Sequence, residues 1–209
     1  MECYTGGASS FRICCGRCKS NKQKAIFLDR DGVINKEVDN LHDINDLEIL
    51  PWVTEWLSMI NKSEYLSLIV TNQPMVAKWM LTEEELDKVH KKMESVIWEK
   101  WAYVDDIYYC PHHPDKWFEW EVPELKIDCD CRKPKIWMIE KAIVQYNIDV
   151  SKSFIIWDST RDIQTWKNAW LKTILVKTWY AWNDWKYHVE PDFVFDDLNQ
   201  ACSFIIKNF

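Results

Sequence analysis

Two carboxylates one residue apart stand out in the segment F-L-D-R-D-G-V-I-N, residues 27–35. Asp29 and Asp31 follow a short apolar run that is typical of a buried strand, so both side chains can face one pocket. In such a pair, one carboxylate can attack phosphorus while the other transfers a proton. A solvated acidic turn after a strand is the alternative interpretation of the pair taken alone.

A third carboxylate, Asp158, closes the apolar run S-F-I-I-W-D at residues 153–158. Three carboxylates form a site of hard oxygen ligands. Mg²⁺ favours such a site, because this ion keeps several waters and also binds a substrate phosphate oxygen. We therefore predict Asp29, Asp31 and Asp158 as ligands of a catalytic magnesium ion.

A second group of candidate metal ligands lies in the segments C-P-H-H-P, residues 110–114, and C-D-C, residues 129–131. Three cysteines and one histidine can form a closed tetrahedral zinc site, which is a structural type. Such a site would tie together the two ends of a long loop. Either His112 or His113 could be the fourth ligand beside the cysteines. Three cysteines brought together by chance are the alternative.

The elements that must position these residues alternate between strands and helices. Polar residues recur where predicted strands end, at the edge where open α/β sheets bind ligands. The alternation predicts a doubly wound parallel sheet of the Rossmann-like type. A capping box at Thr82 and Glu85 opens one helix. The predicted strands span 24–29, 65–72, 105–110, 153–158 and 173–178, with a short strand or helix lead-in at 192–198, and the helices include 52–61, one from 81 and 136–147.

Length and composition fit one α/β domain, which we place at residues 23–209 of the 209-residue chain. Residues 1–22 are interpreted as an irregular extension that includes Cys14, Cys15 and Cys18. These cysteines have no second pair of ligands nearby, at a suitable spacing, that would complete a metal site. The net charge of −7 argues against a nucleic-acid partner. We see neither a membrane-spanning run nor a signal peptide, so a cytoplasmic monomer is expected.

Four motifs together resemble the haloacid dehalogenase superfamily of phosphatases, in the order that this family shows. The resemblance covers roughly residues 24–200. It is closest to the D-glycero-D-manno-heptose 1,7-bisphosphate phosphatase subfamily, which is similar to the histidinol-phosphate phosphatases. The motifs are D-R-D-G-V-I-N (29–35), T-N-Q (71–73), C-R-K-P (131–134) and I-I-W-D-S-T-R-D (155–162).

The resemblance implies a reaction through an aspartyl-phosphate intermediate. Asp29 would be the nucleophile, and Asp31 would protonate the leaving oxygen and then activate water. Thr71 would offer its hydroxyl to the phosphoryl group, and Lys133 would supply positive charge to it. Asp158 would complete the magnesium site.

The resemblance also implies the residues that contact a phosphorylated sugar. Arg132 could reach a second phosphate or sugar hydroxyls, and Asn72 and Gln73 belong to the same binding region. The segment between the first two motifs is too short for a large cap domain, so specificity would depend on the loop from Glu37 to Asn40 and on the zinc loop. The family pattern favours His112 over its neighbour as the zinc ligand. Histidinol phosphate is the alternative substrate, and a phosphate-binding module without activity is the alternative outside enzymes.

Glycine and tryptophan are distributed abnormally. All four glycines lie within the first 32 residues, and all 14 tryptophans follow them. An α/β domain needs glycine at tight turns and helix ends, where the Cβ of tryptophan disfavours positive φ. We interpret many tryptophans as glycine positions of the natural protein, produced when UGA codons that mean glycine are translated as tryptophan. The flagged positions are Trp52, Trp79, Trp157, Trp170, Trp179, Trp182 and Trp185.

The alternative is a protein that is naturally rich in tryptophan. In that case the residues at 179, 182 and 185 could form an exposed aromatic binding surface. If the glycine interpretation holds, strain is expected at the turns, and overpacking is expected at the helix-to-strand joint that holds Trp170.

Overall fold

The computed structural model describes residues 22–38, 41–115, 121–158, 169–177 and 190–209. Its six strands form one parallel sheet in the order β3-β2-β1-β4-β5-β6. The predicted doubly wound parallel sheet is therefore confirmed. The strands are β1 (Lys24–Leu28), β2 (Tyr65–Asn72), β3 (Asp106–Cys110), β4 (Phe154–Trp157), β5 (Lys172–Val176) and β6 (Phe193–Phe195).

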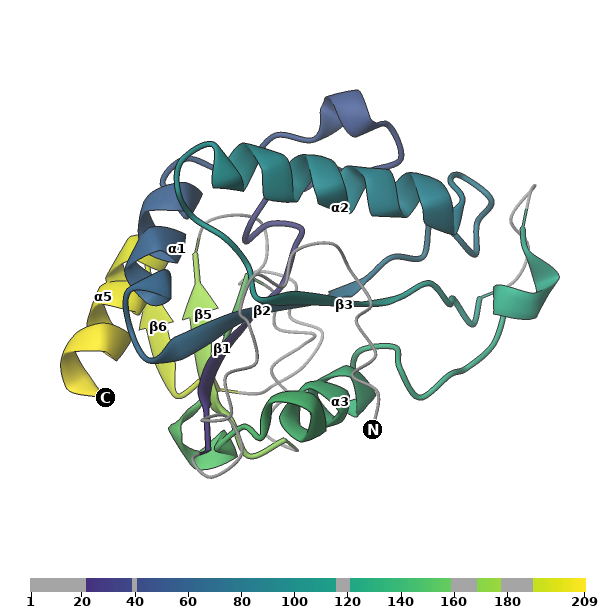
Figure 1. Ribbon diagram of the computed structural model, residues 1–209. Coiled ribbons are helices and arrows are strands. Elements are labelled where there is room, and N and C mark those ends of the chain that lie inside the picture. Colours follow the sequence, from purple (N-terminus) through teal and green to yellow (C-terminus); the bar gives the residue numbers. More distant parts are fainter. Residues whose placement is uncertain (1–21, 39–40, 116–120, 159–168, 178–189) are drawn as a thin grey trace, which may run out of the picture.

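Helices cover both faces of this sheet, as Figure 1 shows. Alternate residues of β1 point to opposite sides, with Ile26 and Leu28 in one apolar cluster and Ala25 and Phe27 in the other. The first cluster is covered by α1 (Val53–Asn61), α2 (Glu83–Trp98) and α5 (Leu198–Asn208), and the second by α3 (Trp137–Tyr146). Both faces of the central strands are buried, which explains their largely apolar sequences.

Local capping signals account for the starts of two helices, α2 and α5. In α2 the Thr82 side chain accepts from the Glu85 N–H, and the Glu85 carboxylate accepts from the Thr82 N–H, so the predicted capping box is confirmed. The ambiguous segment 192–198 contains the short strand β6, and Asp197 then caps α5 by accepting from the Gln200 N–H at 2.8 Å. Short 3₁₀ turns at Ile44–Asp46, Pro123–Leu125 and Val150–Lys152 were not predicted.

The sequence indicated only a short strand or helix lead-in at 192–198, and the extent of the helix α5 was not predicted. Its buried residues Leu198, Ala201, Cys202 and Ile205 follow helical spacing, and that spacing was visible in the sequence. Among the described residues, no helix is long and apolar enough to cross a bilayer. The proposed extension 1–22 lies outside the described residues apart from Lys22.

Tryptophan occupies backbone positions that normally belong to glycine. Within the described ranges, five non-glycine residues have positive φ, and four of them are tryptophan, as listed here: Trp52 (70°), Trp79 (56°), Trp101 (59°), Trp170 (61°) and Asn147 (53°). Left-handed backbone at three of the flagged positions is thus confirmed. Trp101, which ends the turn after α2, was not flagged.

The expected overpacking by tryptophan needs correction. The Trp170 side chain is 85% exposed, so the expected overpacking at this joint is wrong, because its ring projects into solvent. Trp157 is fully buried in β4 and is not among the residues with positive φ. Positions 179, 182 and 185 lie outside the described residues.

Candidate active site and candidate metal cluster

The first and fourth motifs meet at the carboxyl edge of the sheet. Asp29 follows β1 and Asp158 follows β4, and these neighbouring strands flank the point where the strand order reverses. Gly32 has φ +78°, and a Cβ there would lie 2.1 Å from Asp158 Oδ2. Only glycine allows this approach, so the turn after β1 and the Asp158 carboxylate share one site.

The Asp29 carboxylate pairs with the predicted phosphate-binding lysine. Lys133 Nζ donates to Asp29 Oδ2 at 2.6 Å and to the main-chain oxygen of Val70 at 3.2 Å. The two side chains are only 14% and 3% exposed, so each charge compensates the other where water is scarce. The structure thus brings together two predicted catalytic residues from distant motifs.

Asn72 holds the third motif against the end of β2. Its Nδ2 donates to the Lys133 main-chain oxygen, and its Oδ1 accepts from the Lys133 N–H, both at 3.0 Å. These paired bonds fix the main chain from which the Lys133 side chain extends. Asn72 was predicted to bind substrate, whereas its geometry suits the positioning of Lys133.

The Asp31 carboxylate accepts from three side chains. Arg30 donates through Nε and Nη2 at 2.8–3.1 Å, Asn35 through Nδ2 at 2.9 Å, and Gln73 through Nε2 at 2.9 Å. Burial by itself would raise the pKa of Asp31. The Arg30 charge and the three sets of hydrogen bonds outweigh burial and lower this pKa, so the ionised form is favoured.

Arg30, which donates to Asp31, also contacts a histidine, and the sequence did not suggest this contact. Arg30 is 1% exposed, and its Nη1 lies 3.3 Å from Nε2 of His90 on α2. Burial, and then the Arg30 charge, lowers the pKa of His90 to about 3, so its neutral ring can accept from Arg30. The two residues are 60 positions apart, and no local pattern links them.

Thr71 and Gln73, both from the second motif, are also buried in this region, at 1% and 2% exposure. Gln73 Nε2 donates to Thr71 Oγ1 at 2.9 Å as well as to Asp31. The structure therefore places the predicted acid/base residue and the predicted phosphate-binding hydroxyl around one amide.

Three other residues were predicted to contact the substrate: Arg132, Glu37 and Asn40. Arg132 Nη1 donates to the main-chain oxygen of His112 at 3.0 Å, so this residue is tied to the cysteine-containing loop. Glu37 is partly exposed after the first motif. Asn40 lies outside the described residues.

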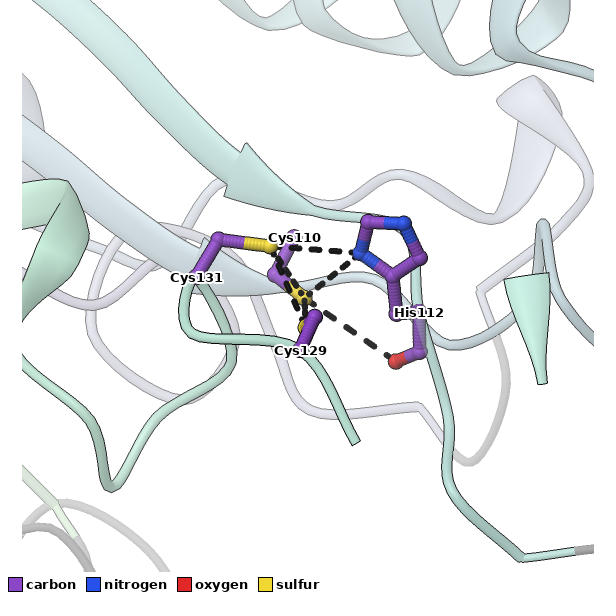
Figure 2. A group of neighbouring side chains, drawn as sticks. All are labelled: Cys110, His112, Cys129 and Cys131. Carbon is purple, nitrogen blue, oxygen red and sulfur yellow. Dashed lines mark hydrogen bonds between the residues drawn. The ribbon is translucent and has the colours of Figure 1, made fainter. Parts of the chain in front are cut away.

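Four side chains converge in Figure 2: Cys110 at the end of β3, His112 just after it, and Cys129 and Cys131 from a later segment. Their donor atoms all lie within 4.8 Å of one another. The three sulfur atoms are 3.2–3.5 Å apart, and His112 Nδ1 lies 3.2 Å from Cys131 Sγ. His113 does not belong to the group, and its ring instead accepts from the Asp115 N–H.

This cluster fits zinc by the chemistry and spacing of its donors. Bonds of about 2.3 Å in a tetrahedral site would place sulfur atoms roughly 3.8 Å apart, which needs only a small expansion. Burial raises the pKa of the Cys110 thiol, and burial also raises that of Cys131. Metal binding would have to displace these protons, because thiolates are the ligands of zinc.

The parallel sheet, with carboxylates and a buried lysine at its carboxyl edge, defines a hydrolase of the haloacid dehalogenase type. The profile of the HAD-hydrolase-like family matches residues 130–201. Two curated relatives are D-glycero-D-manno-heptose-1,7-bisphosphate 7-phosphatases, the α form from Photorhabdus laumondii and the β form from Pasteurella multocida. They are 40% and 37% identical to this chain over 76% and 75% of its length, which corresponds to 85% and 83% of theirs.

The chain belongs to this family of heptose bisphosphate phosphatases and is a phosphoric monoester hydrolase. Among solved structures, that of D,D-heptose 1,7-bisphosphate phosphatase from B. bronchiseptica is similar, and it was determined with magnesium and phosphate. It covers 90% of this chain and 100% of its own, with a TM-score of 0.78 and 26% identity.

Proposed function

We propose that this chain removes the 7-phosphate from D-glycero-D-manno-heptose 1,7-bisphosphate. The observation that carries the chemistry is the pairing of Asp29 with Lys133 at 2.6 Å, at the sheet edge where β4 leads into Asp158. The activities for which the two relatives are named support the sugar substrate. The pathway would be that of heptose for surface polysaccharide, and the enzyme would act in the cytoplasm as a monomer.

Asp29 would attack the phosphoryl group and form the aspartyl-phosphate. Lys133 would then exchange its contact with the Asp29 carboxylate for the phosphoryl oxygens, where negative charge accumulates. Thr71 would donate its hydroxyl to the same group. Thr71 is buried and held by Gln73, so its contribution would require little reorganisation during the reaction.

Asp31 would serve both halves of the reaction. It must carry a proton to release the sugar oxygen, and it must be ionised to take a proton from water when the intermediate is hydrolysed. The lowered pKa favours the second state. An approaching phosphate anion would favour the first, because negative charge nearby raises the pKa of a carboxyl group.

The carboxylates of Asp29 and Asp158 would be the side-chain ligands of the magnesium ion. Asp29 follows β1 and Asp158 follows the neighbouring strand β4, so both carboxylates lie at the same sheet edge, where hard oxygen ligands would suit Mg²⁺. The Asp31 carboxylate accepts hydrogen bonds from Arg30, Asn35 and Gln73. If Asp31 also binds the magnesium ion, its main-chain oxygen would be the ligand. Magnesium would neutralise phosphate charge when bound. The cysteine–histidine cluster would hold a structural zinc ion and keep Arg132 near the substrate.

The test is a comparison of substrates with purified protein. Both anomers of the heptose bisphosphate, histidinol phosphate and p-nitrophenyl phosphate are assayed with magnesium, then with a chelator, then with magnesium restored. The expected result is the highest kcat/KM for one heptose anomer, with loss of the 7-phosphate signal in ³¹P NMR and retention of the 1-phosphate. Higher kcat/KM for histidinol phosphate, or activity that survives the chelator, would contradict the proposal.

A further inference from the structure

The Gln73 amide joins two groups that the proposed reaction needs in defined orientations. An ionised carboxylate can only accept hydrogen bonds, so the amide nitrogen, and not its oxygen, must face Asp31. The same nitrogen has a second hydrogen, which is donated to Thr71 Oγ1. One side chain therefore fixes both partners.

This arrangement determines the direction of the Thr71 hydroxyl. A hydroxyl has one hydrogen to donate, and Thr71 Oγ1 already receives one from Gln73. Its own hydrogen is then directed elsewhere, as a donor suitable for an anionic oxygen. We infer that Gln73 is a positioning residue that orients Thr71 as a donor to the phosphoryl group and holds the Asp31 carboxylate. This inference rests on the proposed roles of Thr71 and Asp31.

The burial of Gln73 supports a role in positioning, since only 2% of the residue is exposed. A merely structural amide would affect stability, whereas a positioning amide affects turnover through Thr71. Gln73→Met keeps the length of the side chain and removes both donors. Gln73→Glu would draw the Thr71 hydrogen toward itself and place a second carboxylate against Asp31.

The experiment measures kcat and KM for Gln73→Met, Gln73→Glu, Thr71→Val and the double variant Thr71→Val/Gln73→Met. Gln145→Met and Gln145→Glu are matched controls, because Gln145 Nε2 also donates to a carboxylate, that of Asp106, at 2.9 Å. We expect kcat to fall roughly tenfold in Gln73→Met and ~10²-fold in Gln73→Glu, with little change in KM. The double variant should lose less than the product of the single losses.

The inference would be overturned if the loss of kcat in the double variant equalled the product of the losses in the two single variants. It would also be overturned if the loss of kcat in each variant simply followed its loss of thermal stability. All variants are also assayed on p-nitrophenyl phosphate. A wrong sugar assignment would change only the substrate ranking of the unmodified enzyme, whereas a wrong role for Gln73 would change the comparison between variants on either substrate.

A second inference concerns the tryptophans and rests on backbone geometry alone. Positive φ is a genuine outlier for a bulky residue. The four tryptophans with positive φ are 68–85% exposed, so packing of their rings does not compensate for the backbone strain. We infer that residues 52, 79, 101 and 170 are glycine in the natural protein. Asn147 needs no such explanation, because asparagine tolerates left-handed backbone at the end of a helix.

A matched pair of substitutions tests this inference. Trp98 and Trp101 are both exposed and their rings are 6.4 Å apart, but Trp98 closes α2 whereas Trp101 has φ 59°. Trp101→Gly should raise Tm by roughly 2–4 °C, whereas Trp98→Gly should lower it, since glycine is unfavourable in a helix. The variant with glycine at 52, 79, 101 and 170 should show an additive rise.

The gene sequence gives an independent answer. UGA codons at these four positions support the inference, and UGG codons overturn it. Equal effects of Trp98→Gly and Trp101→Gly on Tm would also overturn it.

Discussion

Lys133 Nζ and Asp29 Oδ2 lie 2.6 Å apart although 104 positions separate them in the chain. Each is mostly buried, so each depends on the other to offset the cost of a charge away from water. A substrate phosphoryl group approaching Asp29 would arrive where a cation is already in place. The same pair therefore serves the resting enzyme and the reaction.

Asp29→Asn should reduce turnover to below about 1% of the unmodified enzyme, because an amide cannot form the aspartyl-phosphate. The shape of the side chain is nearly constant, so the circular dichroism spectrum should not change. Asp196→Asn, at an exposed carboxylate paired with Lys177, is the control and should retain activity. Turnover above a few per cent in Asp29→Asn would sink the mechanism.

Asn72→Ala should lower both stability and turnover. It removes two hydrogen bonds to the Lys133 main chain, each worth about 0.5–1.5 kcal/mol. If Asn72 positions Lys133, kcat falls while KM for the sugar changes little. A rise in KM with unchanged kcat would instead favour the direct substrate contact that the sequence suggested.

Cys129→Ser should remove zinc and lower thermal stability, since the free energy of metal binding stabilises the folded chain. Plasma emission spectrometry of the purified protein should give one zinc per chain, and less in the variant. Cys202→Ala is the control, because this buried cysteine lies in the core near α1 and outside the cluster. It should lose stability and keep its zinc, whereas absence of zinc from the unmodified protein would contradict the prediction.

His90→Gln should flatten the dependence of stability on pH between about 7 and 5. The pKa of His90 is about 3 in the fold, below its ordinary value of 6.5, so the unfolded chain binds the proton more readily. Stability from this residue is present above pH 6.5 and is lost as pH falls, by up to about 1.4 kcal/mol per pH unit. Glutamine can still accept from Arg30. Denaturant titrations at several pH values measure the slope, and identical slopes in both proteins would refute this account.

The sequence predicted the sheet well because its central strands are buried on both faces and lead into polar residues. The apolar run before Asp29 and the one before Asp158 could be recognised without any tertiary information. The capping box at Thr82 was equally local. The extent of α5 was not predicted, because the segment that leads into it fits a short strand and a helix start equally well.

The relationships between side chains were harder to predict. Asn72 and Gln73 stood in a recognisable motif, but whether an amide faces the substrate or a neighbouring residue depends on contacts across the fold. The support of Arg30 by His90 joins a loop to a helix face, and no spacing rule connects them. Burial of Trp170 was expected from its place between two elements, whereas the left-handed turn directs the ring outward.

The central place of β1 has a consequence for synthesis. Its neighbours are β2 and β4, and the β4 partners of Ile26 and Leu28 are Phe154 and Ile156. At about 5–20 residues per second, a ribosome needs roughly 6–26 s to go from the first of these strands to the last. Throughout that interval one edge of the nascent strand β1 has no native partner, and Asp158 does not yet exist. The catalytic centre is therefore complete only late in translation, and until then the unpaired edge of β1 is open to pairing with other chains.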